Sequence, residues 1–211
     1  SFISESAAHS MVIMVGLARL AEDGLYNSEL VIYRGELMGI YDKIMLTGGD
    51  RKELQFLPGN DVPVFTANGV RFAVIICHDS SFPFPGLIAR LKGAELLFSP
   101  HYNFIQPQTV DAHRKWVRNC HIGLACQLKM VVARSNVVVT GGSDGVGYGD
   151  SFIISPQGEI LAEAELFRTE LLTAKIKPEH FKFPVVWADL DETPATLKET
   201  LGRLLGTNNS P

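Results

Sequence analysis

The sequence has few cysteines, no long apolar run and no excess of positive charge, and each of these shortages narrows what the protein can be. Three of its 211 residues are cysteine, without paired spacing, which argues against a disulfide framework and favours a reducing, cytoplasmic setting. The apolar stretch MVIMVGLARLA is interrupted by Arg19 and is too short to span a bilayer. A net charge of −4 without Lys/Arg runs argues against a nucleic-acid or anionic-membrane partner.

Nothing in the composition divides the chain. No Gly/Ser linker, low-complexity stretch or internal repeat is present. Hydrophobic residues make up 46% and charged residues 20%, as in ordinary globular proteins. We therefore expect a single domain over residues 1–211, with a C-terminal tail from about residue 177.

Apolar periodicity predicts the main elements. It predicts strands at 11–17, 29–33, 36–43, 71–77, 94–100, 130–140 and 170–176, with a hairpin of 151–156 and 159–164 around Gln157-Gly158. It predicts helices at 86–93, 109–129 and 193–206. Strands that alternate with helices and are followed by consecutive strands favour an α/β domain with a mixed, largely buried sheet, arranged as a two-sheet sandwich flanked by helices.

The segment VIICHDSSFP is the first candidate for a catalytic site, because its apolar strand pattern ends at a cysteine. The apolar run stops at Cys77, and a polar turn follows at once. A thiol is nucleophilic only as the thiolate, so it needs a neighbouring base or cation. His78, whose amide could also face an oxyanion, and Lys43 are the candidate activators. On the residues alone, an inert buried cysteine is an equally good reading of Cys77.

Five segments, in order and in register over residues 11–176, resemble the carbon–nitrogen hydrolase (nitrilase) superfamily. YDKIML resembles its Tyr-x-Lys-x-x-Leu segment, ELQFLPG its Glu…Phe-x-x-Gly segment, and VIICHDSSFP its Cys-x-Asp/Glu-x-x-Phe-Pro segment. KGAELLFSP resembles the Gly-Ala-acidic strand that ends in proline, and GDSFIISPQGEIL the Gly-x-Ser…Pro-x-Gly hairpin.

The resemblance implies an α-β-β-α sandwich that hydrolyses a non-peptide carbon–nitrogen bond in a small amide, carbamoyl compound or nitrile. It makes Cys77 the nucleophile that forms a thioester, and Lys43 the catalytic lysine that holds the oxyanion together with the His78 amide. Glu53 corresponds to a second, substrate-orienting glutamate, although its segment aligns loosely and a surface glutamate is an equal alternative. The family needs no metal or organic cofactor, and it implies a homodimer or a higher homo-oligomer.

One family feature is not found. The general base of the family is a glutamate in a Pro-Glu segment at the end of an early strand, and Glu5 has no strand before it. We expect that the sequence is N-terminally incomplete and that the strand, helix and glutamate precede it, because removing the strand would expose a sheet edge. The alternative is a nitrilase-like binding protein that lacks the base.

Three residues after the strand at 94–100 are candidates for the substrate pocket. His101, Tyr102 and Asn103 follow a strand adjacent to that of Cys77 and should lie at the same rim, although a loop-capping role is nearly as good. A third reading is a cysteine hydrolase of another fold, with His78 or His101 as base, but the glycines of a nucleophile elbow are absent.

Two other patterns resemble functional motifs but have simpler readings. Cys120-His121 and Cys126 do not share a helix face, which favours packing over metal binding. The glycine-rich GVGYGDS lacks the context of a phosphate loop and is read as a turn between strands.

Overall fold

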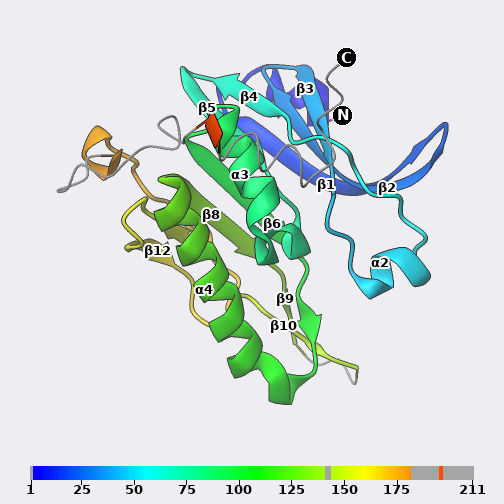
Figure 1. The fold of residues 1–211 in the computed structure, drawn as a ribbon. Coiled ribbons are helices and arrows are strands. Elements are labelled where there is room, and N and C mark those ends of the chain that lie inside the picture. The colour runs from blue at the N-terminus through cyan, green and yellow to red at the C-terminus, as the bar shows by residue number, and fades with distance from the viewer. Residues whose placement is uncertain (1, 141–143, 182–194, 197–211) are drawn as a thin grey trace. The chain divides into compact units, whose positions relative to one another are not determined.

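The computed structural model describes residues 2–140, 144–181 and 195–196 (Figure 1). Residues Ser1–Phe181 form one compact unit, and Lys182–Pro211 are a second. The helix expected at 193–206 lies outside the described residues except for Ala195 and Thr196, which are helical. The single-domain organisation stays a prediction.

The first sheet is an antiparallel meander of β1 (Val12–Ala21), β2 (Gly24–Tyr33) and β3 (Glu36–Asp42). The hairpin expected at Arg34-Gly35 is confirmed, with φ of 49° and 84° at these two residues. Two successive residues of positive φ match the twist of a two-residue hairpin. The strand expected at 11–17 is confirmed as β1, which continues to Ala21 because all ten of its residues pair with β2.

The second sheet has six strands in the order β12-β11-β8-β6-β5-β4. Its centre is parallel, since β5 pairs with β6 and β6 with β8, and the remaining pairs are antiparallel. The expected mixed sheet is therefore confirmed. The bounds of its strands are β4 Val64–Ala67, β5 Val70–Val74, β6 Leu96–His101, β8 Val131–Asn136, β11 Phe152–Ile154 and β12 Ile160–Glu163. A small third sheet joins β7 (Phe104–Ile105), β10 (Val146–Tyr148) and β9 (Val138–Val139).

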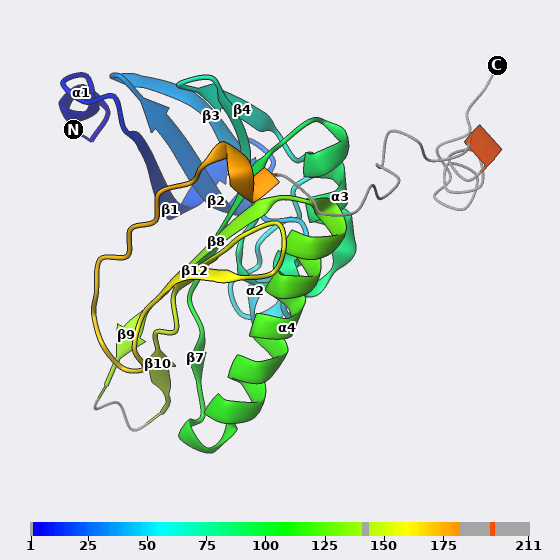
Figure 2. The ribbon, with the colours of Figure 1, turned by 90° about the vertical axis from the view of Figure 1, so that its left-hand side faces the viewer.

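Helices cover one face of the six-stranded sheet. In Figure 2, α3 (Pro83–Leu91) and α4 (Val110–Leu128) lie on that face, and β1–β3 lie on the other. The α/β fold class is confirmed. The short α1 (Phe2–Ser6) contacts β2 and β3. No helix in the described part of the chain is long and apolar enough to cross a membrane.

Three expected strands differ from the structure. The strand of 71–77 ends at Val74, because Asp79 accepts the Ile76 N–H (2.8 Å) and draws the chain into the 3₁₀ helix Cys77–Ser81. The strand of 130–140 breaks between β8 and β9. Residues 170–176 form no strand, because no described strand pairs with them, and Leu171 is 91% exposed.

The glycine-rich segment is also more structured than a turn, because Val146–Tyr148 form β10. Residues 141–143, which precede this segment, lie outside the described residues.

Candidate active site

Cys77 lies in a strained turn that follows β5, one of the parallel strands at the centre of the second sheet. Its φ is 49°, a left-handed conformation that costs a residue with a side chain about 1–3 kcal/mol. The Ser80 hydroxyl donates to the Cys77 carbonyl (2.8 Å), and Asp79 accepts the N–H of Ile76. These bonds hold the turn, and such strain is typical of residues with a function.

Asp79 ties this turn to the end of β3. Its carboxylate is completely buried and accepts from the Tyr41 hydroxyl (2.7 Å), the Met45 N–H (2.7 Å) and the Ile76 N–H (2.8 Å). One buried acceptor therefore fixes both the turn that holds Cys77 and the loop after β3. The acidic position of the Cys-x-Asp/Glu motif thus has a structural role in this chain.

Lys43 sits at the start of that loop with 3% of its surface exposed. Its Nζ lies 2.6 Å from Asp50 Oδ2, and its backbone N–H donates to the Asn27 carbonyl (2.9 Å). Thr47 also donates to Asp50, from its N–H and from its hydroxyl (both 2.8 Å). Burial raises the pKa of Asp50, but the bonds from Lys43 and Thr47 together outweigh it and leave that pKa below its ordinary value. The lysine is therefore a fixed cation with an ionised partner.

Cys77 and Lys43 line one cavity of about 460 Å³, together with Glu29, His101 and Tyr102. A second cavity of about 570 Å³ also reaches Cys77 and is lined by His78, His101 and Asn103 among others. The structure therefore brings together Cys77, Lys43 and all four predicted substrate-binding residues.

Glu53 is not part of this group. It is exposed at the C-terminal end of α2 (Gly48–Lys52) and lines neither cavity. Its catalytic role stays a prediction that this geometry does not support.

Asn103 directs its side-chain amide at the sulfur of Cys77. Its Nδ2 lies 3.5 Å from Cys77 Sγ, while its Oδ1 accepts from the Arg134 guanidinium (2.7 Å). Arg134 is 2% exposed and also donates to the Gly149 carbonyl (3.1 Å). Because the arginine holds the amide oxygen, the amide NH₂ faces the sulfur. Nothing in the local sequence distinguishes Arg134 from a surface arginine, so its role became visible only in the structure.

His101 supports Asn103 through a buried chain of hydrogen bonds. Its Nδ1 lies 3.1 Å from Asn103 Oδ1, its Nε2 lies 3.0 Å from Ser99 Oγ, and Ser99 contacts His121 Nε2 (3.1 Å). Burial lowers the pKa of His101 well below its ordinary 6.5 and the pKa of His121 to about 3. Both rings are therefore neutral at pH 7.

Tyr102 and His78 lie at the edges of the site. Tyr102 is 68% exposed and stacks on Phe104, with ring centroids 6.3 Å apart. His78 packs edge-on against Phe82, with ring centroids 5.2 Å apart, and burial lowers its pKa.

The Cys77 thiol is less acidic than an ordinary cysteine. Burial raises the pKa of Cys77, whereas Lys43, the main chain of Tyr102, Arg134 and Asn103 lower it. The nearby cation therefore acts in the expected direction, but burial outweighs all these groups and leaves the pKa above its ordinary value. A protonated thiol needs a proton acceptor before it can attack.

The cysteines on α4 form no site. Cys120 is partly buried, and Cys126 is exposed, so the packing interpretation is wrong for Cys126. Within the described ranges, no group of three or more His, Cys, Asp or Glu side chains could hold a metal ion.

Comparison with known proteins gives a consistent result. The sequence model for carbon–nitrogen hydrolases matches residues 2–182. N-carbamoylputrescine amidase of Arabidopsis thaliana is 30% identical over 184 residues, which are 82% of this chain and 62% of that protein. Citrullinase of Francisella tularensis is 31% identical over 178 residues, which are 79% of this chain and 62% of that protein. The chain thus spans about three fifths of the length of these relatives.

Solved structures agree on the fold. Saccharomyces cerevisiae Nit3, described as a member of branch 10 of the nitrilase superfamily, superposes with a TM-score of 0.73 at 19% identity, over 99% of this chain and 69% of its own. An amidase from Nesterenkonia sp. has a TM-score of 0.73 at 18% identity, over 95% of this chain and 70% of its own.

Proposed function

Because this chain belongs to the carbon–nitrogen hydrolase family, we propose that it hydrolyses the carbon–nitrogen bond of a small amide, carbamoyl compound or nitrile through Cys77. The observation that carries the proposal is the placement of Cys77, at a strained turn, in one cavity with the buried Lys43. The named relatives act on carbamoyl and amide compounds according to their names, and we extend that class of substrate to this chain.

In the proposed reaction of an amide, the Cys77 thiolate attacks the carbonyl carbon and the carbonyl oxygen becomes negative. The Lys43 ammonium and the His78 amide stabilise that oxygen. Lys43 suits this task because Asp50 fixes its position, so little reorganisation is needed as charge develops. The amine or ammonia leaves, and water hydrolyses the thioester. No metal ion or organic cofactor takes part.

The substrate is proposed to lie between Cys77 and the residues after β6. Asn103 can donate to the sulfur or to the substrate, because Arg134 occupies its oxygen. Tyr102 is exposed at the edge of the cavity and is proposed to contact the variable part of the substrate. The homo-oligomer and the cytoplasmic location remain predictions.

A second candidate is a binding protein that does not turn its ligand over. The observation that favours it is the raised pKa of the Cys77 thiol, which leaves the thiol protonated at neutral pH. Such a protein would bind an amide in the same cavity without releasing an amine.

The deciding experiment compares Cys77→Ala with the matched control Cys126→Ala, which removes an exposed thiol of α4. Release of ammonia or amine is measured across a panel of amides and carbamoyl compounds, and circular dichroism checks the fold. We expect no turnover from the first variant and full turnover from the second. Turnover by Cys77→Ala would overturn the proposal, and binding without turnover by the unaltered protein would support the second candidate.

A further inference from the structure

Arg134 is a buried cation whose charge is not matched by a carboxylate. It is 2% exposed, and among the described residues no acidic side chain forms an ion pair with it. The Asp150 carboxylate is paired instead with Arg114 (2.9 Å) and Arg118 (2.6 Å) of α4. The Nε atom of Arg134 is also buried without a hydrogen-bond partner among the described residues. Because a guanidinium stays protonated inside proteins, burying it without a counter-charge is costly and calls for a functional explanation.

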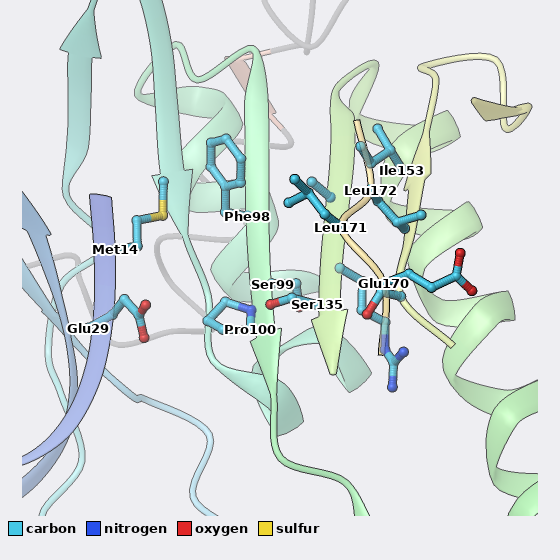
Figure 3. A pocket seen from close by; sticks show the side chains of 13 residues that line it. Met14, Glu29, Phe98, Ser99, Pro100, Ser135, Ile153, Glu170, Leu171 and Leu172 are labelled. Atoms are coloured by element: carbon cyan, nitrogen blue, oxygen red, sulfur yellow. The ribbon is translucent and has the colours of Figure 1, made fainter. Parts of the chain in front are cut away.

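The side chain of Arg134 points to the face of the second sheet that α4 covers. Side chains alternate along a strand, and Ala133 shares the opposite face with its register partners Phe98 and Ile153. Figure 3 shows Phe98 and Ile153 at the cavity of about 390 Å³ on that opposite face. Arg134 shares its own face with Phe152, its register partner, and its guanidinium carbon lies 5.4 Å from the centroid of that ring. Water therefore screens the charge of Arg134 very little.

Arg134 reaches Cys77 through Asn103. A guanidinium nitrogen donates to Asn103 Oδ1 (2.7 Å), and Asn103 Nδ2 lies 3.5 Å from Cys77 Sγ. The main-chain N–H of Asn103 donates to Asn136 Oδ1 (2.9 Å). Asn136 and Arg134 also both donate to the Gly149 carbonyl, at 2.7 and 3.1 Å. Strand β8 therefore holds Asn103 by its side chain and by its main chain, so that the orientation of its amide is fixed.

We propose that Arg134 is a positioning residue that acts through Asn103 to stabilise the Cys77 thiolate, an assignment that rests on the proposed hydrolase function. The Asn103 amide donates a hydrogen bond to the ionised sulfur, and the charge of Arg134 polarises that amide and offsets the negative charge. A hydrogen bond to an ionised group is about twice as strong as one between neutral groups, so the contact favours the thiolate over the thiol. Burial raises the pKa of Cys77, and Arg134 and Asn103 are two of the groups that lower it.

Other titratable or charged groups also line the two cavities at Cys77. They are Glu29, Lys43, Asp50, His78, His101, Tyr102 and His113. The variants that test the assignment leave all of these groups in place. A change in the titration of Cys77 among the variants therefore reports on Asn103 and Arg134.

The first test changes the contact with the sulfur and keeps the contact with the arginine. Asn103→Asp has nearly the shape of asparagine and gives Arg134 a carboxylate partner, so we expect it to fold. It replaces the donor that faces the sulfur by an acceptor, which disfavours the thiolate. Alkylation of Cys77 by iodoacetamide is followed by mass spectrometry from pH 7 to pH 11. Its inflection should move up by about one pH unit or more. Asn119→Asp, at an exposed position of α4, is the matched control and should leave the profile unchanged.

The second test asks whether Arg134 acts through Asn103. Arg134→Gln removes the charge, and Asn103→Leu removes the amide at similar volume. Each should slow the alkylation of Cys77, and the double variant should be no slower than the slower single variant, because both changes remove one interaction. Arg134→Lys keeps the charge and should slow alkylation less than Arg134→Gln does. If Arg134→Gln does not fold by circular dichroism, the same cycle is measured with Arg134→Lys. Arg168→Gln, which alters an exposed arginine, is the matched control.

The outcomes separate this assignment from the proposed function. Turnover by Cys77→Ala overturns the hydrolase mechanism itself. If Cys77→Ala is inactive, an unchanged alkylation profile in Asn103→Asp or in the Arg134 variant, or additive slowing in the double variant, overturns the assignment alone. An upward shift together with non-additive slowing supports it. Alkylation requires no turnover, so these results test the assignment even if no amide in the panel is hydrolysed.

Discussion

Replacing Glu29 by glutamine should make the protein more stable at alkaline pH, and the size of the gain follows from burial. The pKa of the Glu29 carboxyl rises from an ordinary 4.5 to about 7 in the folded protein. Because the folded pKa lies above the unfolded one, this group contributes stability that is fully present below pH 4.5 and is lost as the pH rises through 7. The full loss is about 3 kcal/mol, at 1.36 kcal/mol for each pH unit between the two values.

The assay is urea unfolding followed by circular dichroism at several pH values from 5 to 8. Glutamine has no charge to bury, so the variant escapes the penalty. Its free energy of unfolding, relative to that of the unaltered protein, should increase by about 2 to 3 kcal/mol across this range. Glu36→Gln removes an exposed carboxyl. The difference between its free energy of unfolding and that of the unaltered protein should not change with pH.

The reasoning is refuted if the free energies of unfolding of Glu29→Gln and of the unaltered protein change in parallel with pH. That result would mean that Glu29 is not desolvated in the folded state.

Three further changes test how the site is held. Asp79→Ala should lower the free energy of unfolding by about 3 kcal/mol or more. The substitution leaves the Tyr41 hydroxyl and the N–H groups of Met45 and Ile76 without their acceptor. A loss under about 1 kcal/mol in urea unfolding would contradict this. Gly59→Ala should lower kcat, because an added Cβ would lie 2.1 Å from the Asp42 carbonyl and displace the segment that ends in Lys43; unchanged kinetics would show that the loop adapts. Tyr102→Ala should alter relative rates across an amide panel but leave the urea midpoint unchanged, since the side chain is 68% exposed; equal relative rates would remove Tyr102 from substrate recognition.

The two residues that we propose to carry the chemistry were identified from local motifs in the sequence. Cys77 and Lys43 stand in short motifs that can be recognised from the order of their residues alone. The structure places both residues in one cavity. The parallel centre of the second sheet also followed, because buried apolar runs separated by a helix have few other arrangements. The rim residues His101, Tyr102 and Asn103 followed from the rule that neighbouring parallel strands end at one edge.

Errors arose where the outcome depends on a partner distant in the chain. Residues 170–176 have the alternation of a strand, but a strand needs a neighbour, and the described residues provide none there. The role of Glu53 stays a prediction, because its motif aligns loosely and the residue lies on the surface at the end of α2.

By itself, the sequence determined the order of the elements and pointed to Cys77 and Lys43 as the proposed nucleophile and its lysine, because these motifs depend on residues near one another in the chain. Only the tertiary structure decided the electrostatics around them. The raised pKa of Cys77, the pairing of Asp50 with Lys43 and the burial of Glu29 all follow from which groups the fold packs together. Desolvation depends on every atom that packs around a group, and those atoms come from segments as distant in the sequence as Met14 on β1 and Leu172.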